Sequence, residues 1–303
     1  MKRTNPPPSI HSISELHSLL RLPKPAHPLV SVVNCAEIPF EPGDLTFGFL
    51  NNFYILSIKK DFKGKLKYGQ QYYDFDEGMM SFMAPGQWIA QHSGTNLVGW
   101  SLIFHPDFIR NYPLAKTIRN YGFFSYAVNE ALHLSEKEEA MIVSLLQNIQ
   151  QEYLSTIDAF SQPVIVSQID LFLNYCNRFY NRQFITRSNA NSDLLTRLEA
   201  VLSDFFNTGK LRETGLPTVQ SISEQLNVSP TYLSDMLRSM TGKNTQQHIH
   251  DKLIEKAKEI LTSTSLSVSE VAYQLGFEYP QSFNKLFKNK TKLSPLAFRQ
   301  SFN

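Results

Sequence analysis

The stretch TVQSISEQLNVSPTYLSDMLRSM (218–240) has a second copy in SVSEVAYQLGFEYPQSFNKLFKN (267–289). The first halves of the two copies align at an offset of 49 residues, so that Leu226 corresponds to Leu275. After an internal turn the offset becomes 50 residues. An internal repeat of this length predicts that one supersecondary unit occurs twice in the chain.

Each copy has the parts of a helix-turn-helix. Thr218 and Ser267 are N-cap residue types at the start of a short first helix, and Ser267 is spaced to form a capping box with Glu270. Asn227 and Gly276 tolerate the left-handed backbone that ends a helix and begins a tight turn. A second helix follows in each copy. The sequence therefore predicts two helix-turn-helix units.

The second helix of each copy has one apolar and one polar face when its residues are placed about 100° apart. The polar residues are of types that pair with base edges or hold phosphates. We expect base contacts from Thr231, Ser234, Asp235, Gln281, Asn284 and Lys285. We expect phosphate contacts from Arg238, Lys288, Lys290 and Lys292. An exposed side chain that contacts nothing would explain any single one of these residues equally well.

The two polar faces differ in charge. Asp235 offsets Arg238 in the first copy, whereas the segment KLFKNKTK (285–292) has four lysines and no acidic residue. We therefore expect the second copy to supply more of the salt-dependent binding to a polyanion. Residues 182–303 as a whole carry 15 basic and 11 acidic side chains, which favours the same kind of partner.

A helix is predicted between the two units, from about Gln246 to Leu261. Ile249, Leu253 and Ala257 lie four residues apart and form its buried stripe. Sixteen residues at about 1.5 Å each give a rod of roughly 24 Å. Such a rod is suited to hold two helices about one turn of DNA apart, so that both enter successive major grooves.

These segments resemble the AraC/XylS family of bacterial transcriptional regulators. The resemblance rests on ISEQLNVSPTYLSDMLRSMTGKN, KLIEKAKEILTSTSLSVSEVAYQLGF and SFNKLFKNKTKLSPLAFRQ, which together cover about the last 90 residues. Three residues depart from the family's usual pattern. Lys292 stands where many members have glycine, Pro280 begins the second recognition helix, and Asp235 occupies a position that is more often basic or polar. The departures bear on base preference.

The resemblance implies a transcription regulator in the cytoplasm that binds a double-stranded DNA operator. It also implies RNA polymerase as a partner, and a sensory N-terminal part with a cupin-like β-barrel followed by helices used for dimerisation. A small-molecule effector and a homodimer are thus expected. We weigh two alternatives: a metal-dependent cupin enzyme fused to a DNA-binding domain, and a protein–protein adaptor that would bind no DNA. A DNA-repair enzyme would need clustered cysteines, and Cys35 stands alone in the N-terminal part.

The first half of the chain has the signals of short strands. Five segments between residues 53 and 104 are rich in aromatic and β-branched residues and are separated by glycine-containing turns. This pattern favours an antiparallel barrel or sandwich. The first fifty residues contain many prolines and are predicted to form an arm and an irregular segment before the strands.

Helical periodicity begins at Ser135, which forms a capping box with Glu138. We predict helices over 136–154 and 164–180. The polar segment at 187–192 is the predicted linker, which gives an N-terminal domain over 1–186 and a DNA-binding domain over 193–303. The predicted fold class is α+β: an N-terminal cupin-like antiparallel β-barrel with helices, then an all-α domain with two helix-turn-helix units.

Candidate small-molecule and metal sites are few. The aromatic residues Tyr72, Phe82, Trp88 and Trp100 are candidates for lining a ligand pocket, although core packing explains them better. His92 and His105 have no carboxylates patterned around them, and the chain has only two cysteines, far apart. No metal site, no other cofactor and no catalytic residue is therefore predicted. No apolar run approaches the ~20 residues that a membrane span needs.

Overall fold

The structure is a computed structural model of the 303-residue chain. It describes residues 9–39, 49–59, 66–68, 71–73, 78–89, 98–127, 130–155, 158–186, 188–207, 211 and 215–302. The chain divides into two compact units, Met1–Gln183 and Phe184–Asn303. The division falls before the predicted linker 187–192, and residues from Ser188 onward are helical. The amide of Asn191 donates a hydrogen bond to the Phe184 carbonyl (2.6 Å), which gives this polar segment a buried partner.

The first unit is built on a five-stranded antiparallel sheet with the order β10-β7-β4-β9-β2. Its strands are β2 (Val30–Asn34), β4 (Tyr54–Lys59), β7 (Met79–Met83), β9 (Gly99–Phe104) and β10 (Leu132–His133). Leu56 lies opposite both Phe82 and Leu102, so these three side chains share one face of the sheet. All three are buried, which makes this face apolar.

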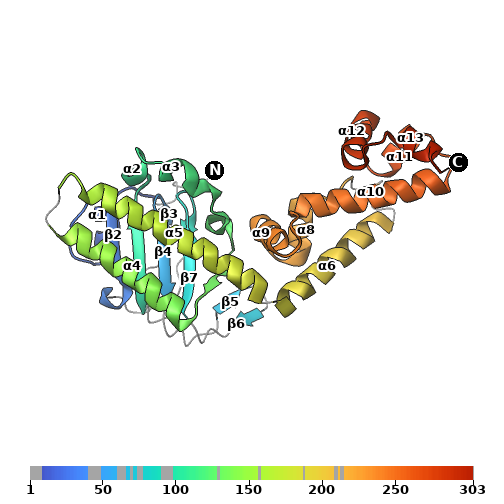
Figure 1. Cartoon of the computed structure of the whole chain (residues 1–303). Helices are drawn as coiled ribbons and strands as arrows, with labels where there is room; N and C mark the ends of the chain where they lie inside the picture. The colour runs from blue at the N-terminus through green and yellow to red at the C-terminus, as the bar shows by residue number, and fades with distance from the viewer. Residues whose placement is uncertain are drawn as a thin grey trace, which may run out of the picture. The chain divides into compact units, whose positions relative to one another are not determined.

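Two long helices cover that apolar face (Figure 1). They are α4 (Glu136–Leu154), whose bounds coincide with the predicted helix, and α5 (Ser161–Thr186), which extends beyond the predicted 164–180 at both ends. The predicted capping box at Ser135 is present. The Tyr153 hydroxyl accepts a hydrogen bond from the Val32 amide (3.0 Å) and donates one to the Val32 carbonyl (3.1 Å), so α4 covers the open edge of β2.

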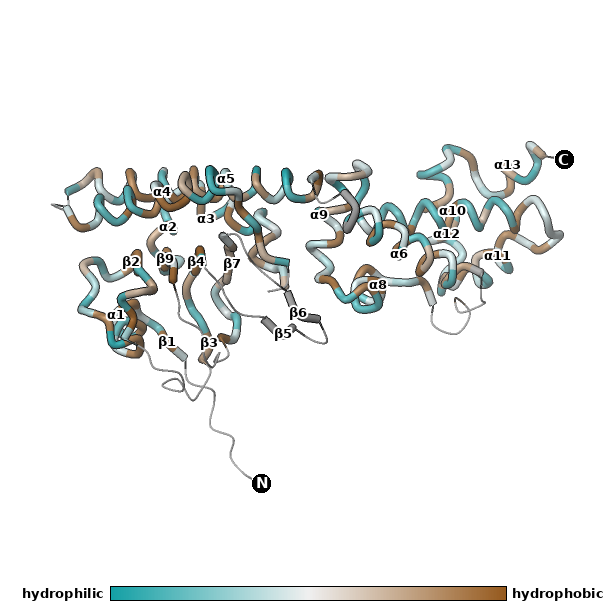
Figure 2. Tube along the Cα trace, turned by 90° about the horizontal axis from the view of Figure 1, so that it is seen from below, coloured by the Kyte–Doolittle hydropathy of each residue, from teal (hydrophilic) through white to brown (hydrophobic). Residues whose placement is uncertain are grey.

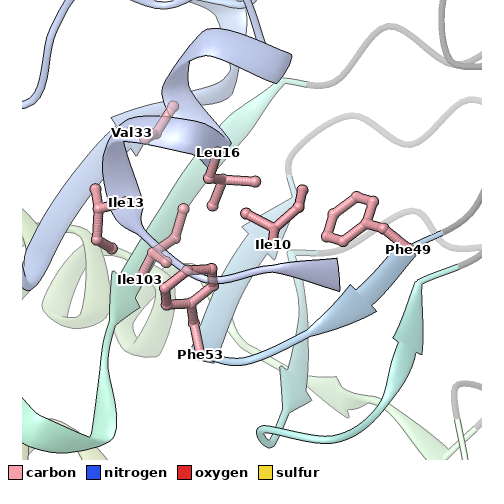
Figure 3. Close-up of a cluster of buried hydrophobic side chains, with 7 residues drawn as sticks. All are labelled: Ile10, Ile13, Leu16, Val33, Phe49, Phe53 and Ile103. Atoms are coloured by element: carbon pink, nitrogen blue, oxygen red, sulfur yellow. The ribbon is translucent and has the colours of Figure 1, made fainter. Parts of the chain in front are cut away.

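The other face of the sheet packs against the first elements of the chain. Helix α1 (Ile13–Leu19) and a small sheet of β1 (Ser9–Ile10), β3 (Phe49–Asn51) and β8 (Trp88–Ile89) lie there (Figure 2). Figure 3 shows the apolar cluster that joins them, formed by Ile10, Ile13, Leu16, Val33, Phe49, Phe53 and Ile103. An irregular arm over the first fifty residues is therefore the wrong prediction for 9–34. Pro23, Pro25 and Pro28 fall between α1 and β2 and interrupt neither element.

The described strands form three separate sheets and do not close into the barrel that the sequence suggests. The third sheet is the hairpin of β5 (Leu66–Tyr68) and β6 (Gln71–Tyr73). The remaining elements of this unit are short helices, namely α2 (Pro106–Ile109), α3 (Leu114–Thr117), η1 (Cys35–Glu37), η2 (Ile118–Asn120) and η3 (Gly122–Ser125). The fold is thus α+β, with strands in the first unit and helices alone among the described residues of the second.

The second unit follows the predicted helical pattern. Its helices are α6 (Ser188–Asn207), α8 (Val219–Leu226), α9 (Pro230–Thr241), α10 (Thr245–Ser263), α11 (Val268–Gln274), α12 (Pro280–Thr291) and α13 (Pro295–Gln300). Helix α10 is the predicted connecting helix, and its stripe of Ile249, Leu253 and Ala257 is buried. Among the described residues no helix combines the length and apolar character that crossing a membrane requires.

Candidate nucleic-acid interface

The turns of the two helix-turn-helix units have the same backbone geometry. Asn227 has a φ of 57° and Gly276 a φ of 82°, both in the left-handed region. The amide after each of them donates back across the turn, from Val228 to the Ser223 carbonyl (3.1 Å) and from Phe277 to the Ala272 carbonyl (3.0 Å). The predicted turns at Asn227 and Gly276 are therefore confirmed as one local structure formed twice.

The second helices of the two units also end in the same way. Gly242 (φ 75°) ends α9, and Lys292 (φ 67°) ends α12. The Thr241 hydroxyl donates to the Leu237 carbonyl (2.8 Å), and Thr291 does the same at the corresponding position of α12 (2.8 Å). Lys292 thus adopts a conformation that glycine adopts without strain, and the family's usual glycine at this position has a physical reason.

The starts of the helices explain the remaining local features. Thr218 and Ser267 cap α8 and α11 as predicted, and the Glu270 carboxylate accepts the Ser267 amide (2.7 Å). The hydrogen bonds from Ser267 lower the pKa of the Glu270 carboxyl. Pro280 is the first residue of α12, where its missing amide hydrogen costs no helical hydrogen bond. The departure at Pro280 is therefore compatible with an intact second helix.

The polar face of α9 is close to neutral. Arg238 Nη1 lies 3.0 Å from Asp235 Oδ1, so the two charges expected there pair with each other. The Ser234 hydroxyl forms a hydrogen bond with the Thr245 hydroxyl of α10 (2.9 Å), and Ser234 therefore lies at the edge of the face, toward α10. Thr231 is half-buried in the first turn. Of this set, Arg238 has the most exposed side chain.

The polar face of α12 is open and basic. Gln281, Asn284, Lys285 and Lys288 are all exposed, and their 3–4 residue spacing places them on one side of the helix. Neither Lys285 nor Lys288 forms an ion pair with any residue that the structure describes. Phe283 and Phe287 point inward and are fully buried. This side of α12 therefore presents amides and two ammonium groups to solvent together.

The two remaining lysines are placed differently. Lys290 Nζ lies 2.7 Å from Asp251 Oδ1 on α10, so its side chain is directed toward α10 and away from the Gln281 face. The phosphate contact predicted for Lys290 stays a prediction, and it would require this ion pair with Asp251 to open. Nine residues separate Lys290 from Gln281, which is about half a turn out of phase at 100° per residue. The Lys292 ammonium donates to the Asn289 carbonyl (3.1 Å) at the end of the helix.

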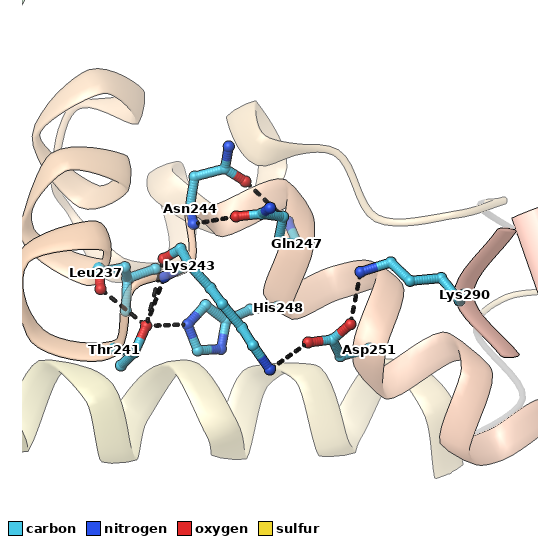
Figure 4. Close-up of polar contacts among 8 residues, drawn as sticks. All are labelled: Leu237, Thr241, Lys243, Asn244, Gln247, His248, Asp251 and Lys290. Atoms are coloured by element: carbon cyan, nitrogen blue, oxygen red, sulfur yellow. Dashed lines mark hydrogen bonds and ion pairs between the residues drawn. The ribbon is translucent and has the colours of Figure 1, made fainter.

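A polar network connects α9 to α10 and was not expected from the sequence (Figure 4). A hydrogen bond joins Thr241 Oγ1 to His248 Nε2 (2.8 Å), and Lys243 Nζ pairs with Asp251 Oδ2 (2.7 Å). Burial, followed by the Lys243 charge, lowers the pKa of His248. The lysines on either side lower the pKa of the Asp251 carboxyl, although its partial burial opposes them. Tertiary contacts of this kind leave no periodic signal in the sequence.

Three of the four candidate pocket aromatics have side chains that the structure describes, and these three lie in different surroundings. Phe82 packs on Phe123, with 4.4 Å between ring centroids, in the layer between the sheet and α5. Trp88 is 48% exposed on another sheet, and Trp100 is half-buried on β9. The side chain of Tyr72 lies outside the described part. Core packing therefore accounts for Phe82.

Metal ligands do not cluster within the described ranges. No group of three histidine, cysteine, aspartate or glutamate side chains is arranged there to hold a metal ion. His105 caps α2 and lies beside Asp107, and His92 lies outside the described residues. Cys35 and Cys176 are free thiols, and burial raises the pKa of both.

Comparison with known proteins agrees with the geometry of the second unit. Residues 222–301 match a family of helix-turn-helix domains. The uncharacterized HTH-type transcriptional regulator YijO of Escherichia coli K12 is 20% identical over 248 residues, which cover 76% of this chain and 84% of that protein. The HTH-type transcriptional activator RhaS of Salmonella heidelberg is 26% identical over 48% of this chain. The chain spans about half the length of this activator, 50%.

A solved structure is also similar to this chain. It is the C-terminal domain of the two-component response regulator yesN from Fusobacterium nucleatum, which is 31% identical to this chain. The similarity covers 37% of this chain and 99% of that domain, with a TM-score of 0.30.

Proposed function

The chain belongs to the AraC/XylS family of helix-turn-helix transcriptional regulators, and on this premise we propose that it reads an operator with α9 and α12 in successive major grooves. The observation that carries the proposal is the repeat. Two units with the same turn and the same helix end lie on one continuous helix, α10. The function is therefore recognition of duplex DNA in the cytoplasm, with no catalytic step. RNA polymerase is the second partner that the family implies.

The exposed residues of the two second helices divide into two proposed roles. Thr231, Asp235, Gln281, Asn284 and Lys285 would contact bases, with Ser234 at the margin because it bonds to Thr245. Arg238, Lys288 and Lys292 would hold phosphates. The exposed face of α12 directly supports a role in DNA contact. The support is weaker for α9, because Asp235 and Arg238 pair with each other there.

Selection of random DNA duplexes by the purified full chain, followed by sequencing, tests the proposal. Enrichment of two sequence blocks about 10 base pairs apart, centre to centre, is the expected result. Replacing Gln281 and Asn284 together by alanine should remove the preference within one block, and Thr231→Ala should weaken the other. Recovery of a single block, or of no motif at all, would refute the two-helix mode of recognition.

We propose that the first unit dimerises through the exposed side of α5. Val164 and Leu171 are 39% and 46% exposed there, and they line a shallow apolar groove with Pro163, Ser167 and Gln168. The Gln168 side-chain oxygen is buried without a hydrogen-bond partner in the structure. A second copy seated on this groove would cover the apolar side chains. Leu171→Asp should convert a dimer into a monomer in analytical ultracentrifugation, whereas Glu152→Gln on α4 should not.

We also propose an effector site in a cupin-like first unit, on the sheet face that packs against α1. Ser57 and Ser101 lie opposite each other on that face, with their hydroxyls 2.8 Å apart. The Cys35 thiol lies 3.5 Å from the Ser101 hydroxyl, and burial lowers the pKa of the neighbouring Lys59. A small molecule with a polar or anionic group fits such a lining. A ligand that raises the melting temperature of the wild-type chain should lose this effect in Ser101→Val.

A further inference from the structure

A single carboxylate, that of Asp251, connects the two helix-turn-helix units through α10 (Figure 4). Its Oδ2 atom lies 2.7 Å from Lys243 Nζ, and its Oδ1 atom lies 2.7 Å from Lys290 Nζ. Lys243 follows α9 directly, and Lys290 lies in the last turn of α12. Each unit therefore contributes, from the end of its second helix, one cation to the same anion.

The two units differ in how firmly they are held to α10. Helix α9 has two further side-chain hydrogen bonds to α10, between Ser234 and Thr245 (2.9 Å) and between Thr241 and His248 (2.8 Å). Among the described residues, the Lys290 ion pair is the only hydrogen-bonded contact from α12 to α10. The orientation of α12 on α10 thus depends on Lys290 more than that of α9 depends on Lys243.

Two side-chain hydrogen bonds attach α13 and α12 to α10 at separate points, in addition to the packing of α11 and α13 against that helix. Near the C-terminal end of α10, Arg299 Nε of α13 donates to the Leu261 carbonyl (2.9 Å). The second point is Asp251, ten residues earlier, or about 15 Å along the helix axis. Two points that far apart define an angle, whereas one point would allow the unit to pivot. Within the second unit, Phe287 of α12 packs on Phe298 of α13, with 5.4 Å between ring centroids, so α12 and α13 are joined to each other.

We propose that Asp251 is a positioning residue that sets the angle between the two recognition helices, and so the spacing of the two operator blocks that the chain accepts. The proposal rests on the proposed function. The side chain of Asp251 is 31% exposed, that of Lys290 is 32% exposed and that of Lys243 is 54% exposed. The Asp251–Lys290 ion pair is therefore better shielded from solvent than the Asp251–Lys243 ion pair. The ion pair with Lys290 therefore contributes more than the ion pair with Lys243 to setting the angle between the helices.

The test begins with the duplex selected from a random library by the wild-type chain. Derivatives with one base pair inserted or removed between the blocks are then measured with wild type, Asp251→Asn, Lys290→Gln and Lys243→Gln. The wild type should bind the derivatives more weakly than the parent duplex, and the ratio of the two affinities is the spacing penalty. Asp251→Asn should reduce that spacing penalty by up to about fivefold, the effect expected of one partly exposed ion pair. Lys290→Gln should resemble it, and Lys243→Gln should have a smaller effect.

Two controls separate positioning from general effects of charge. Glu255→Gln removes a carboxylate one turn further along α10 that forms an ion pair with Lys252 (3.4 Å), and it should leave the penalty unchanged. Asp251→Glu keeps the charge and should restore most of the penalty. An unchanged spacing penalty in Asp251→Asn, even with a lower melting temperature, would overturn the proposal by reducing the ion pairs to a stabilising role.

A second result would also overturn it. If Asp251→Asn steepens the dependence of affinity on salt while the spacing penalty stays as in wild type, then Asp251 only competes with DNA phosphates for the two lysines. Failure of the proposed function has a different signature, because the wild-type chain would then enrich no two-block motif in the first step.

Discussion

The open basic face of α12 makes a quantitative prediction for the double variant Lys285→Ala/Lys288→Ala. Both side chains are exposed, and neither has an ion-pair partner among the residues described. Their removal should not disturb the fold, since the fully buried Phe283 and Phe287 anchor that part of the helix in the core. Any change in DNA affinity should therefore come from lost contacts with phosphates or bases.

The magnitude follows from counterion release. Each phosphate neutralised on duplex DNA contributes about 0.9 to the slope of log K against log salt, so the variant should lose up to ~1.8 in slope. When salt rises from ~50 mM to ~200 mM, the ratio of wild-type affinity to variant affinity should therefore fall about twelvefold. Fluorescence anisotropy with one labelled duplex at five or six salt concentrations measures both slopes.

The matched control is Lys252→Ala/Lys256→Ala on α10, which removes the same net charge. Both of these lysines pair with glutamates of their own helix, at 3.4 Å and 2.9 Å. This control should change the slope by well under one. Equal slope changes in the two double variants would mean that net charge, and not the face of α12, drives binding. An unchanged slope in the α12 variant would refute the reasoning outright.

Three further predictions concern stability, each measured as a free energy of urea unfolding of the full chain. Gly276→Ala should destabilise the folded chain more than Gly242→Ala does. Both glycines have a positive φ, which alone costs an alanine about 1–2 kcal/mol. Of the two, only Gly276 would bring an added Cβ to 2.9 Å from a backbone oxygen, that of Leu211. Tyr153→Phe should cost about 1–3 kcal/mol, because it leaves the buried amide and carbonyl of Val32 unpaired. The pKa of His248 is lower in the folded chain than its ordinary value of 6.5, so the unfolded chain binds this proton more readily. The free energy of unfolding should therefore fall as the pH drops below 6.5, and His248→Gln should make that fall smaller.

The second unit could be predicted closely because its signals are local. A capping residue, a left-handed turn residue and an apolar stripe act over four to eight residues, and each is visible in one copy and repeated in the other. Helix α10 begins at Thr245 and ends at Ser263, close to the predicted 246–261. The outward direction of Lys285 and Lys288 also followed from helical phase alone.

Other features depend on contacts between distant residues and could not be predicted in this way. Helix α1 and strand β2 lie in a proline-rich stretch, and the chain orders there because Ile13 and Val33 join a cluster with Phe49, Phe53 and Ile103. The role of Asp251 depends on Lys290, 39 residues away. Helical phase places Lys290 about half a turn from Gln281, which agrees with its side chain being directed toward α10. The closed barrel was inferred from strand content, which does not determine how strands pair.

The two units show which parts of a helix-turn-helix are free to vary. The left-handed positions of one unit have counterparts in the other: Asn227 with Gly276, and Gly242 with Lys292. Lys292 keeps the left-handed conformation without being glycine, so the geometry is maintained even where the residue type makes it costly. The outward faces have instead diverged. On α9 the charges of Asp235 and Arg238 neutralise each other, whereas Lys285 and Lys288 on α12 have no ion-pair partner among the described residues. We therefore expect this difference in charge to make α12 contribute more than α9 to salt-dependent affinity.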